Sequence, residues 1–204
     1  MNFTKGELKF LKSLNTPAKV QDYLNSLPFN FEYDGVDTIK SPLRVLREHN
    51  AHCFEGAILG AYILSLHKHK SLLMYLKTTK HDFDHVIAPF KIGKYWGALS
   101  KTNHNVLRYR EPIYKDIREL AMSYFHEYFL DNGDKTLRQY SDILDLSKIK
   151  ENWAIDKNDL WYIDKALDKM KHFDIVPKEV LKKLRKVDKI EVSASKREEY
   201  KKRK

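Results

Sequence analysis

The chain contains one cysteine, Cys53, and a histidine, His85, that could act together as a nucleophile and its base. Cys53 follows Asn50, a residue that can cap a helix, and would then lie in the first turn of that helix. Free N–H groups and the helix dipole stabilise a thiolate there, and the same N–H groups can stabilise an oxyanion. A nucleophilic thiol also needs a base within hydrogen-bond reach, and His85 begins a predicted strand. The pair therefore indicates thiol chemistry directed at a carbonyl group.

The segment around Cys53 is the most apolar part of the chain. Residues 51–67 are apolar around nearly the whole circumference of a helix, and such a helix belongs in the middle of a domain. Glu55 is its one charged interior residue and needs a partner, for which Arg44 or Arg47 is expected. The sequence thus predicts a buried central helix.

Three short segments after this helix have the character of β-strands. They cover residues 71–77, 85–91 and 94–100. Ile92-Gly93, between the last two, is typical of a hairpin turn. Pro89 lies inside the second segment and favours an edge position or a bulge. His85 would therefore open a strand of a small antiparallel sheet.

The rest of the chain has helical patterns on both sides of these strands. They cover residues 7–27 with a break at Pro17, 42–48, 113–129 and 153–170. This order predicts an α+β fold rather than alternating βαβ units. We expect one domain over residues 1–176, with extra helices at both ends. Residues 177–204 are expected to form a basic C-terminal helix followed by a frayed tail.

The order of these features resembles the transglutaminase-like superfamily, which has a papain-like cysteine protease fold. The typical pattern of that superfamily is a His that opens a strand, a Gly turn, then a Trp followed four residues later by an Asp. This chain has His85, Gly93 and Trp96, and Ser100 stands in the place of the Asp. An uncharacterised, mostly bacterial branch of the superfamily is similar to this chain in three runs. They are residues 50–57, 96–104 and 107–112, within a resemblance that spans about residues 14–147.

The resemblance implies a role for each of five residues. Cys53 would be the nucleophile and His85 its base. Ser100 or Asn103 would orient His85, because papain-like relatives use an Asn there, although a Ser hydroxyl lacks the charge of an Asp. Gln21 is a candidate oxyanion donor, since relatives often supply one from upstream of the Cys. The implied function is cysteine-dependent acyl transfer on a peptide, amide or ester, without a cofactor.

Two alternatives come from the same residues. The missing Asp at position 100 also fits a catalytically inactive domain of this fold that acts as a binding or scaffolding module. Metal-ligating side chains occur close together at His81, Asp82, Asp84 and His85, and at His67 and His69. His81 and His85 would share a face only on a helix, and their segment has the pattern of a loop that enters a strand. We therefore expect no metal.

Composition limits the partners. The formal net charge is +10, but residues 177–204 hold twelve Lys or Arg and five Asp or Glu (+7), which leaves +3 on the other 176 residues. A nucleic-acid groove should instead form a basic face on the body, so nucleic acid is not expected. No apolar stretch reaches the roughly 20 residues that cross a bilayer, and the N-terminus lacks a signal sequence. We expect a cytoplasmic protein without a membrane span, and the sequence does not indicate its oligomeric state.

Overall fold

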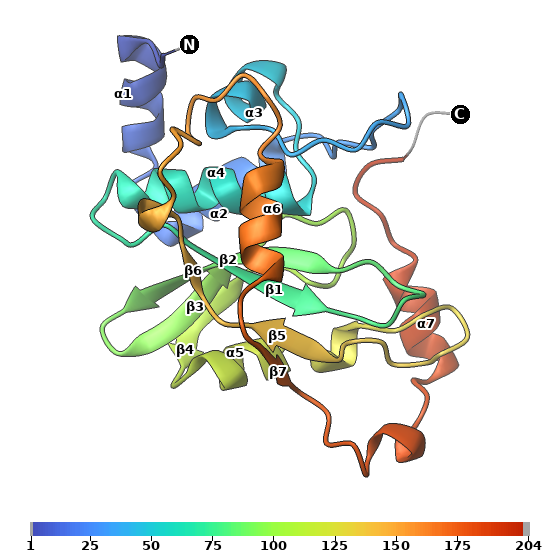
Figure 1. Ribbon diagram of the computed structural model, residues 1–204. Helices are drawn as coiled ribbons and strands as arrows, with labels where there is room; N and C mark the ends of the chain where they lie inside the picture. Colours follow the sequence, from blue (N-terminus) through green and yellow to red (C-terminus); the bar gives the residue numbers. More distant parts are fainter. Residues whose placement is uncertain (1, 202–204) are drawn as a thin grey trace.

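The computed structural model describes residues 2–201, and its framework is an antiparallel sheet. The strands are β1 (Leu72–Lys77), β2 (His85–Ile92), β3 (Tyr95–Leu99), β4 (Arg110–Tyr114), β5 (Gln139–Ser141), β6 (Leu144–Asp145) and β7 (His172–Asp174). Their order is β4-β3-β2-β1-β5-β7, and β6 pairs with the start of β1. The long strands β1, β2 and β3 therefore form the centre of the sheet (Figure 1).

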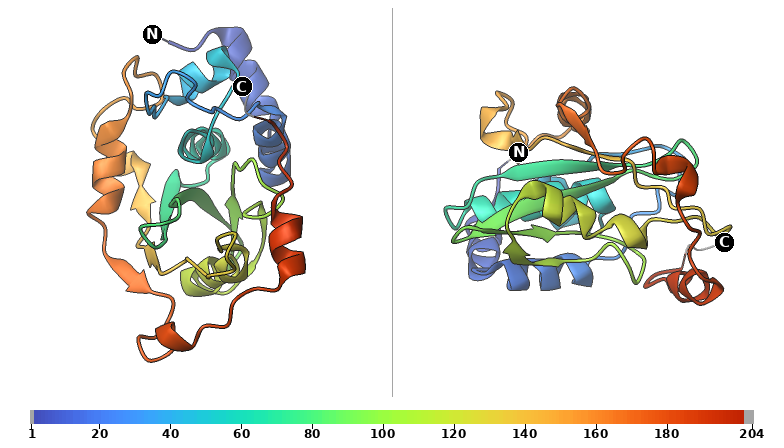
Figure 2. Two further views of the ribbon diagram at one scale, coloured as in Figure 1. Left: turned by 90° about the vertical axis from the view of Figure 1, so that its right-hand side faces the viewer. Right: turned by 90° about the horizontal axis from the view of Figure 1, so that it is seen from below.

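Helices cover both faces of this sheet. They are α1 (Lys5–Ser13), α2 (Pro17–Ser26), α3 (Pro42–Glu48), α4 (Cys53–Ser65), α5 (Ile117–Met122), α6 (Trp161–Asp168) and α7 (Lys189–Ser195), with short 3₁₀ turns η1 (Phe125–Glu127), η2 (Leu146–Lys148) and η3 (Leu181–Lys183). Helices α2, α3 and α4 lie on one side of the sheet and α5 lies on the other (Figures 1 and 2). The predicted α+β class is confirmed.

Alternation along the central strands produces two cores. Leu73 and Val86 belong to the cluster that surrounds α4, whereas their neighbours Met74 and Ile87 belong to the cluster below the sheet. Successive side chains of a strand point to opposite faces, so each central strand is buried on both sides. Helix α4 is buried along nearly its whole length, as its all-round apolar pattern predicts.

Pro89 does not lie at an edge or in a bulge, so that prediction is wrong. It is in the central strand β2 and pairs with Ala98 of β3 in regular register. The pairs between β1 and β2 end at Ile87, two residues earlier. Pro89 therefore lies beyond the point where a backbone N–H would be needed on the β1 side.

The helix expected over residues 113–129 is also wrong in part. Residues 110–114 form the edge strand β4, in which exposure alternates along the strand. The helix begins only at Ile117, because the Asp116 side chain caps it by accepting the Glu119 N–H. Similarly, only Trp161–Asp168 of the predicted 153–170 segment is helical.

The C-terminal segment differs from the expected helix and frayed tail. Helix α7 has only seven residues, and Glu198 after it forms an isolated antiparallel bridge with His104. The Asn105 N–H donates to the Arg197 carbonyl, and the Glu199 N–H donates to the Asn103 carbonyl. Figure 2 shows α7 and α6 on opposite sides of the end of α4. The described part of the tail is thus bonded to the body.

None of the described helices combines the length and apolar character needed to cross a membrane.

Candidate active site

Cys53 is the first residue of α4, and its thiol opens into a pocket of about 1170 Å³. The residue that caps the helix is His52, in an extended conformation, whose Nδ1 accepts the Phe54 N–H at 3.2 Å. Glu55 accepts the His52 N–H at 3.0 Å and completes a capping box. Asn50, the expected cap, instead accepts a hydrogen bond from the Lys40 ammonium. The helix begins two residues later than predicted, which places Cys53 directly at its N-terminus.

Glu55 is fully buried, and the donors around it come from the loop before α3 rather than from the predicted arginines. Its carboxylate accepts hydrogen bonds from the Asn30 amide, the Thr38 hydroxyl and the Lys40 backbone N–H. The Lys40 ammonium lies 3.8 Å away. This network ties residues 30–40 to the start of α4.

Neither of the arginines expected beside Glu55 reaches it. Arg44 pairs with Glu48 and Asp159, and Arg47 pairs with Glu7. Both therefore hold other parts of the chain together, and the positive charges near the buried carboxylate come from Lys40 and His52 instead.

His85 begins β2 and is 5% exposed. Its Nε2 lies 2.7 Å from the Ser100 hydroxyl, which lies 2.5 Å from the Leu107 carbonyl. A carbonyl can only accept, so the Ser100 hydroxyl donates its hydrogen bond to the Leu107 carbonyl. Ser100 then accepts a hydrogen bond from the N–H at His85 Nε2. The other nitrogen, Nδ1, is then free of a proton and available to Cys53. Ser100 thus selects the tautomer in which His85 can act as a base.

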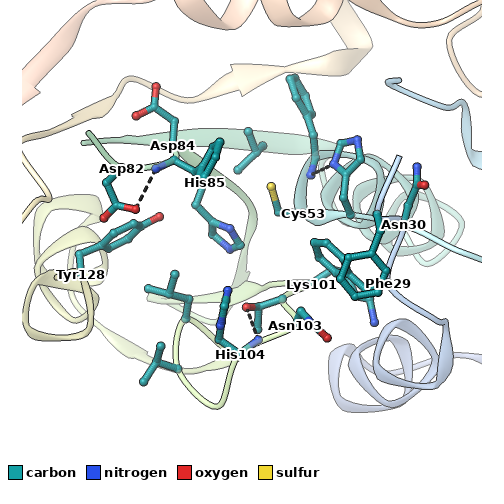
Figure 3. A pocket seen from close by; sticks show the side chains of 18 of the residues that line it. Phe29, Asn30, Cys53, Asp82, Asp84, His85, Lys101, Asn103, His104 and Tyr128 are labelled. Atoms are coloured by element: carbon teal, nitrogen blue, oxygen red, sulfur yellow. Dashed lines mark hydrogen bonds between the residues drawn. The ribbon is translucent and has the colours of Figure 1, made fainter. Parts of the chain in front are cut away.

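Figure 3 shows Cys53 beside His85 in the pocket, and His52 directly precedes Cys53 in the chain. Burial acts to raise the pKa of the thiol, but hydrogen bonds with His52 and His85 and the positive charge of the two rings outweigh it. The pKa of Cys53 is therefore held well below its ordinary value. A lowered pKa increases the fraction of a thiol that is thiolate at neutral pH, and the thiolate is the more reactive form.

His52 has a second role beside its cap. Its Nε2 lies 2.7 Å from the Thr38 carbonyl, so this nitrogen carries a proton. Burial acts to lower the pKa of His52, but the hydrogen bond with Cys53 and the charges of Glu55 and Cys53 raise it to about 9. A second proton would take up Nδ1, which now accepts the Phe54 N–H. Capping the helix and carrying charge beside Cys53 therefore compete at this ring.

Gln21 and Asn103, the other two predicted site residues, use their side chains to bond backbone groups. The Gln21 amide donates to the Ser100 carbonyl at 2.8 Å and accepts the Ser100 N–H at 3.0 Å. The Asn103 amide makes the equivalent pair of hydrogen bonds with the backbone of Tyr200. Gln21 therefore fixes Ser100 in place, and Asn103 fixes the C-terminal segment.

The pocket contains residues that the sequence did not single out as site residues. Lys101 is fully buried, and burial lowers the pKa of its ammonium to about 8. Tyr128 is 3% exposed, and its hydroxyl has no hydrogen-bond partner among residues 2–201. Figure 3 shows Tyr128 with Asp82 and Asp84 on one side of His85. Tyr128 also belongs to the hydrophobic cluster below the sheet, and nothing in the sequence around it indicates a position in a pocket.

The alternative of a metal site finds no support in the geometry. In the described part of the chain, no group of three or more His, Cys, Asp or Glu side chains could hold a metal ion. Asp82 and Asp84 instead accept hydrogen bonds from Thr136 and Thr78.

No protein-family model matches the chain, and no curated protein is significantly similar to it. The site is therefore interpreted from its own geometry.

Proposed function

We propose that the protein is a cysteine-dependent acyl-transfer enzyme in which Cys53 is the nucleophile and His85 is the base. The observation that carries this proposal is the pair of contacts from His85 to Ser100 and from Ser100 to the Leu107 carbonyl, beside a thiol whose pKa the His85 ring lowers. A nucleophile, a base and a group that orients the base are the three parts that such chemistry requires. A pocket in front of the thiol leaves room for a substrate.

The steps follow from this arrangement. His85 Nδ1 takes the thiol proton, and the thiolate attacks the carbonyl carbon of an amide or ester. The backbone N–H of Cys53 has no partner within the helix and can donate to the oxyanion. His85 returns the proton to the leaving amine or alcohol, and a thioester forms. Water or an amine then attacks the thioester, with His85 taking its proton and the Cys53 thiol leaving.

The resemblance to the transglutaminase-like superfamily supports the proposal. The expected order of a Cys at a helix start, a His that opens a strand, a tight turn and a second strand corresponds to α4, β2 and β3. Gly93 in the turn has a φ of 59°, a conformation that Gly adopts freely. Ser100 has the position expected for the orienting residue, and its hydrogen bond to the Leu107 carbonyl lets it orient His85, although without the charge of an Asp.

The reactivity of Cys53 tests the proposal. The chain has one cysteine, so alkylation by iodoacetamide, followed by mass spectrometry, reports on that thiol alone. We expect the rate at pH 5.5 to exceed that of a free cysteine by tenfold or more, because the pKa of Cys53 is lowered. His85→Ala should remove much of this excess and move the midpoint of the pH–rate profile upward.

Two further variants separate the role of His85 from a general loss of structure. Ser100→Ala should slow alkylation by about tenfold, as expected for one lost hydrogen bond at a reacting group. His126→Ala, outside the pocket, should leave the rate unchanged. If Cys53 reacts like a free thiol and His85→Ala has no effect, the chain is instead a binding or scaffolding module of this fold.

A further inference from the structure

The pocket has the opposite charge to the rest of the protein. Among the described residues that line it, eight are Asp or Glu and two are Lys, although the chain has a formal net charge of +10. When the charges that line a cleft all have one sign, the low dielectric of its walls strengthens the electrostatic field inside. Such a cleft attracts ligands of the opposite charge. The excess of carboxylates therefore favours a positively charged ligand in the pocket.

Some of these carboxylates are neutralised by neighbours within the described chain. Glu127 pairs with Arg110, Asp131 pairs with Lys196, and Glu32 lies 3.6 Å from His52.

Three others, Asp82, Asp84 and Asp164, make no ion pair with residues 2–201, and we call them the acidic wall. Asp84 accepts the Thr78 N–H at 2.7 Å, and Asp82 accepts the Thr136 hydroxyl at 2.5 Å. Their partners are neutral, so these contacts hold the carboxylates in place without cancelling their charge.

Asp164 completes the acidic wall from α6. Burial, together with the charges of Asp168 and Asp84, raises the pKa of Asp164. The nearby Lys77 ammonium is already paired with Asp168. A half-buried carboxylate without its own cation, close to other carboxylates, is a position that a ligand cation would stabilise.

Tyr128 is an independent sign that this side of the pocket holds a ligand. Tyr128 lines the pocket, and its buried hydroxyl has no partner in the described chain. Burial and the charges of Cys53, Asp82 and Asp84 raise its pKa, so the phenol stays neutral. An unpaired buried hydroxyl costs free energy, and the nearby carboxylates of Asp82 and Asp84 give its surroundings a negative potential that favours a cationic donor.

The mouth of the pocket also carries exposed aromatic rings beside the acidic wall. Phe83, between Asp82 and Asp84, is 90% exposed, and Trp161 at the start of α6 is 41% exposed. Both line the pocket. Aromatic faces together with carboxylates are the groups that bind the alkyl stem and the charged end of an ammonium or guanidinium.

We propose that the substrate of the Cys53 site carries a positively charged side chain, which binds between the acidic wall and Tyr128. The guanidinium or ammonium would lie against Asp84 and Asp164, and its reacting carbonyl would reach Cys53. This inference rests on the proposed acyl-transfer function and adds a substrate class to it: peptides, amides or esters of a basic amino acid.

Charged thiol reagents test the charge of the pocket directly. The full-length protein is treated with the cationic 2-aminoethyl methanethiosulfonate or the anionic 2-sulfonatoethyl methanethiosulfonate, each of which forms a mixed disulfide with Cys53 and releases methanesulfinate. The rate of each reagent with Cys53 is divided by the rate of the same reagent with 2-mercaptoethanol, which corrects for the intrinsic reactivity of the reagent. We expect the cationic reagent to be favoured by about tenfold or more. Asp164→Asn and Asp84→Asn should each reduce this ratio several-fold, while Asp22→Asn, on exposed α2 outside the pocket, should not.

Protection experiments test the substrate class. N-acetyl-argininamide should slow the reaction of Cys53 with the neutral methyl methanethiosulfonate, whereas the uncharged N-acetyl-norleucinamide should not. Tyr128→Phe should weaken this protection, because it removes the hydroxyl that faces the bound cation. Fast reaction of Cys53 with no charge preference, or a preference that survives in both Asp variants, would overturn this inference alone. Reaction no faster than a free thiol would overturn the proposed function and this inference together.

Discussion

Two helices of this protein, α1 and α4, begin with the same local motif in opposite environments. At α1, the Thr4 hydroxyl accepts the Glu7 N–H and the Glu7 carboxylate accepts the Thr4 N–H. At α4, His52 and Glu55 make the equivalent capping box. The first box lies on the surface, and the second lies in the wall of the pocket.

The difference lies in what each glutamate does besides capping. Glu7 also pairs with Arg47, and hydrogen bonds from that side chain and from Thr4 lower its pKa to about 2. Glu55 is fully buried and gathers donors from residues 30–40. In either place, the capping box satisfies free N–H groups at the start of the helix. Only the buried one also fixes Cys53 against the other residues of the pocket.

Glu55→Gln should produce the largest loss of stability. Donors from Asn30, Thr38, Lys40 and His52 converge on this carboxylate, and an amide would turn an NH₂ group toward some of them. We expect the free energy of unfolding to fall by about 3–5 kcal/mol in urea denaturation. Glu7→Gln is the matched control and should have a far smaller effect. Equal losses in the two variants would refute the contrast between the two boxes.

Replacing the glycine near each helix start by alanine should change the free energy of unfolding in opposite directions. A Cβ at Gly56 would lie 2.4 Å from Cβ of buried Lys101, whereas one at Gly6 would meet only the Thr4 hydroxyl oxygen at 3.9 Å. Gly56→Ala should therefore cost about 1–3 kcal/mol through overpacking. Gly6→Ala should stabilise by about 0.5–1 kcal/mol, since alanine loses less backbone entropy in a helix. Thermal unfolding of both variants would reveal whether the signs differ.

His52→Asn should separate capping from activation of the thiol. Asparagine is a good cap, so we expect stability to change little. Its side chain has no positive charge, and His52 is one of the groups that lower the pKa of Cys53. The pKa of Cys53 should therefore rise, so that alkylation slows at acidic pH and recovers as the pH increases. The same pH–rate profile in wild type and variant would mean that His85 alone activates the thiol.

The smallest effect should come from Thr4→Ala at α1. Loss of this cap is expected to lower the free energy of unfolding by about 1 kcal/mol. The rate of Cys53 alkylation should stay at its wild-type value, because the α1 box has no contact with the pocket. Slower alkylation in this variant would show that the two helix starts are coupled.

The sequence predicted the elements of the fold whose signals are local. The all-round apolar run gave α4, and β-like segments joined by Ile92-Gly93 gave β2 and β3. Residues 113–129 were misassigned because the pattern of apolar side chains carries no information that residues 110–114 pair with β3. Pairing between strands is a tertiary property, and it overrides local preference.

The candidate site was only partly predictable for a similar reason. The sequence placed Ser100 where the orienting residue should be, and the structure brings it to His85. The partners of Glu55, Gln21 and Asn103 lie on segments far away in the chain, so only folding reveals them. Tyr128 gave no signal because an unpaired hydroxyl is a property of its surroundings.

The Leu107 carbonyl at the end of the Ser100 contact has a consequence for how such sites are recognised. Leu107 has a φ of 59°, and its N–H donates to Glu127 at 2.6 Å, which turns the carbonyl toward Ser100. The series of contacts from His85 to Ser100 to Leu107, which we call the relay, therefore ends at a main-chain atom that every amino acid possesses. Evolution could exchange the side chain at position 107, for example to Gly or Asn, without losing the relay. A motif written in side chains alone would overlook it.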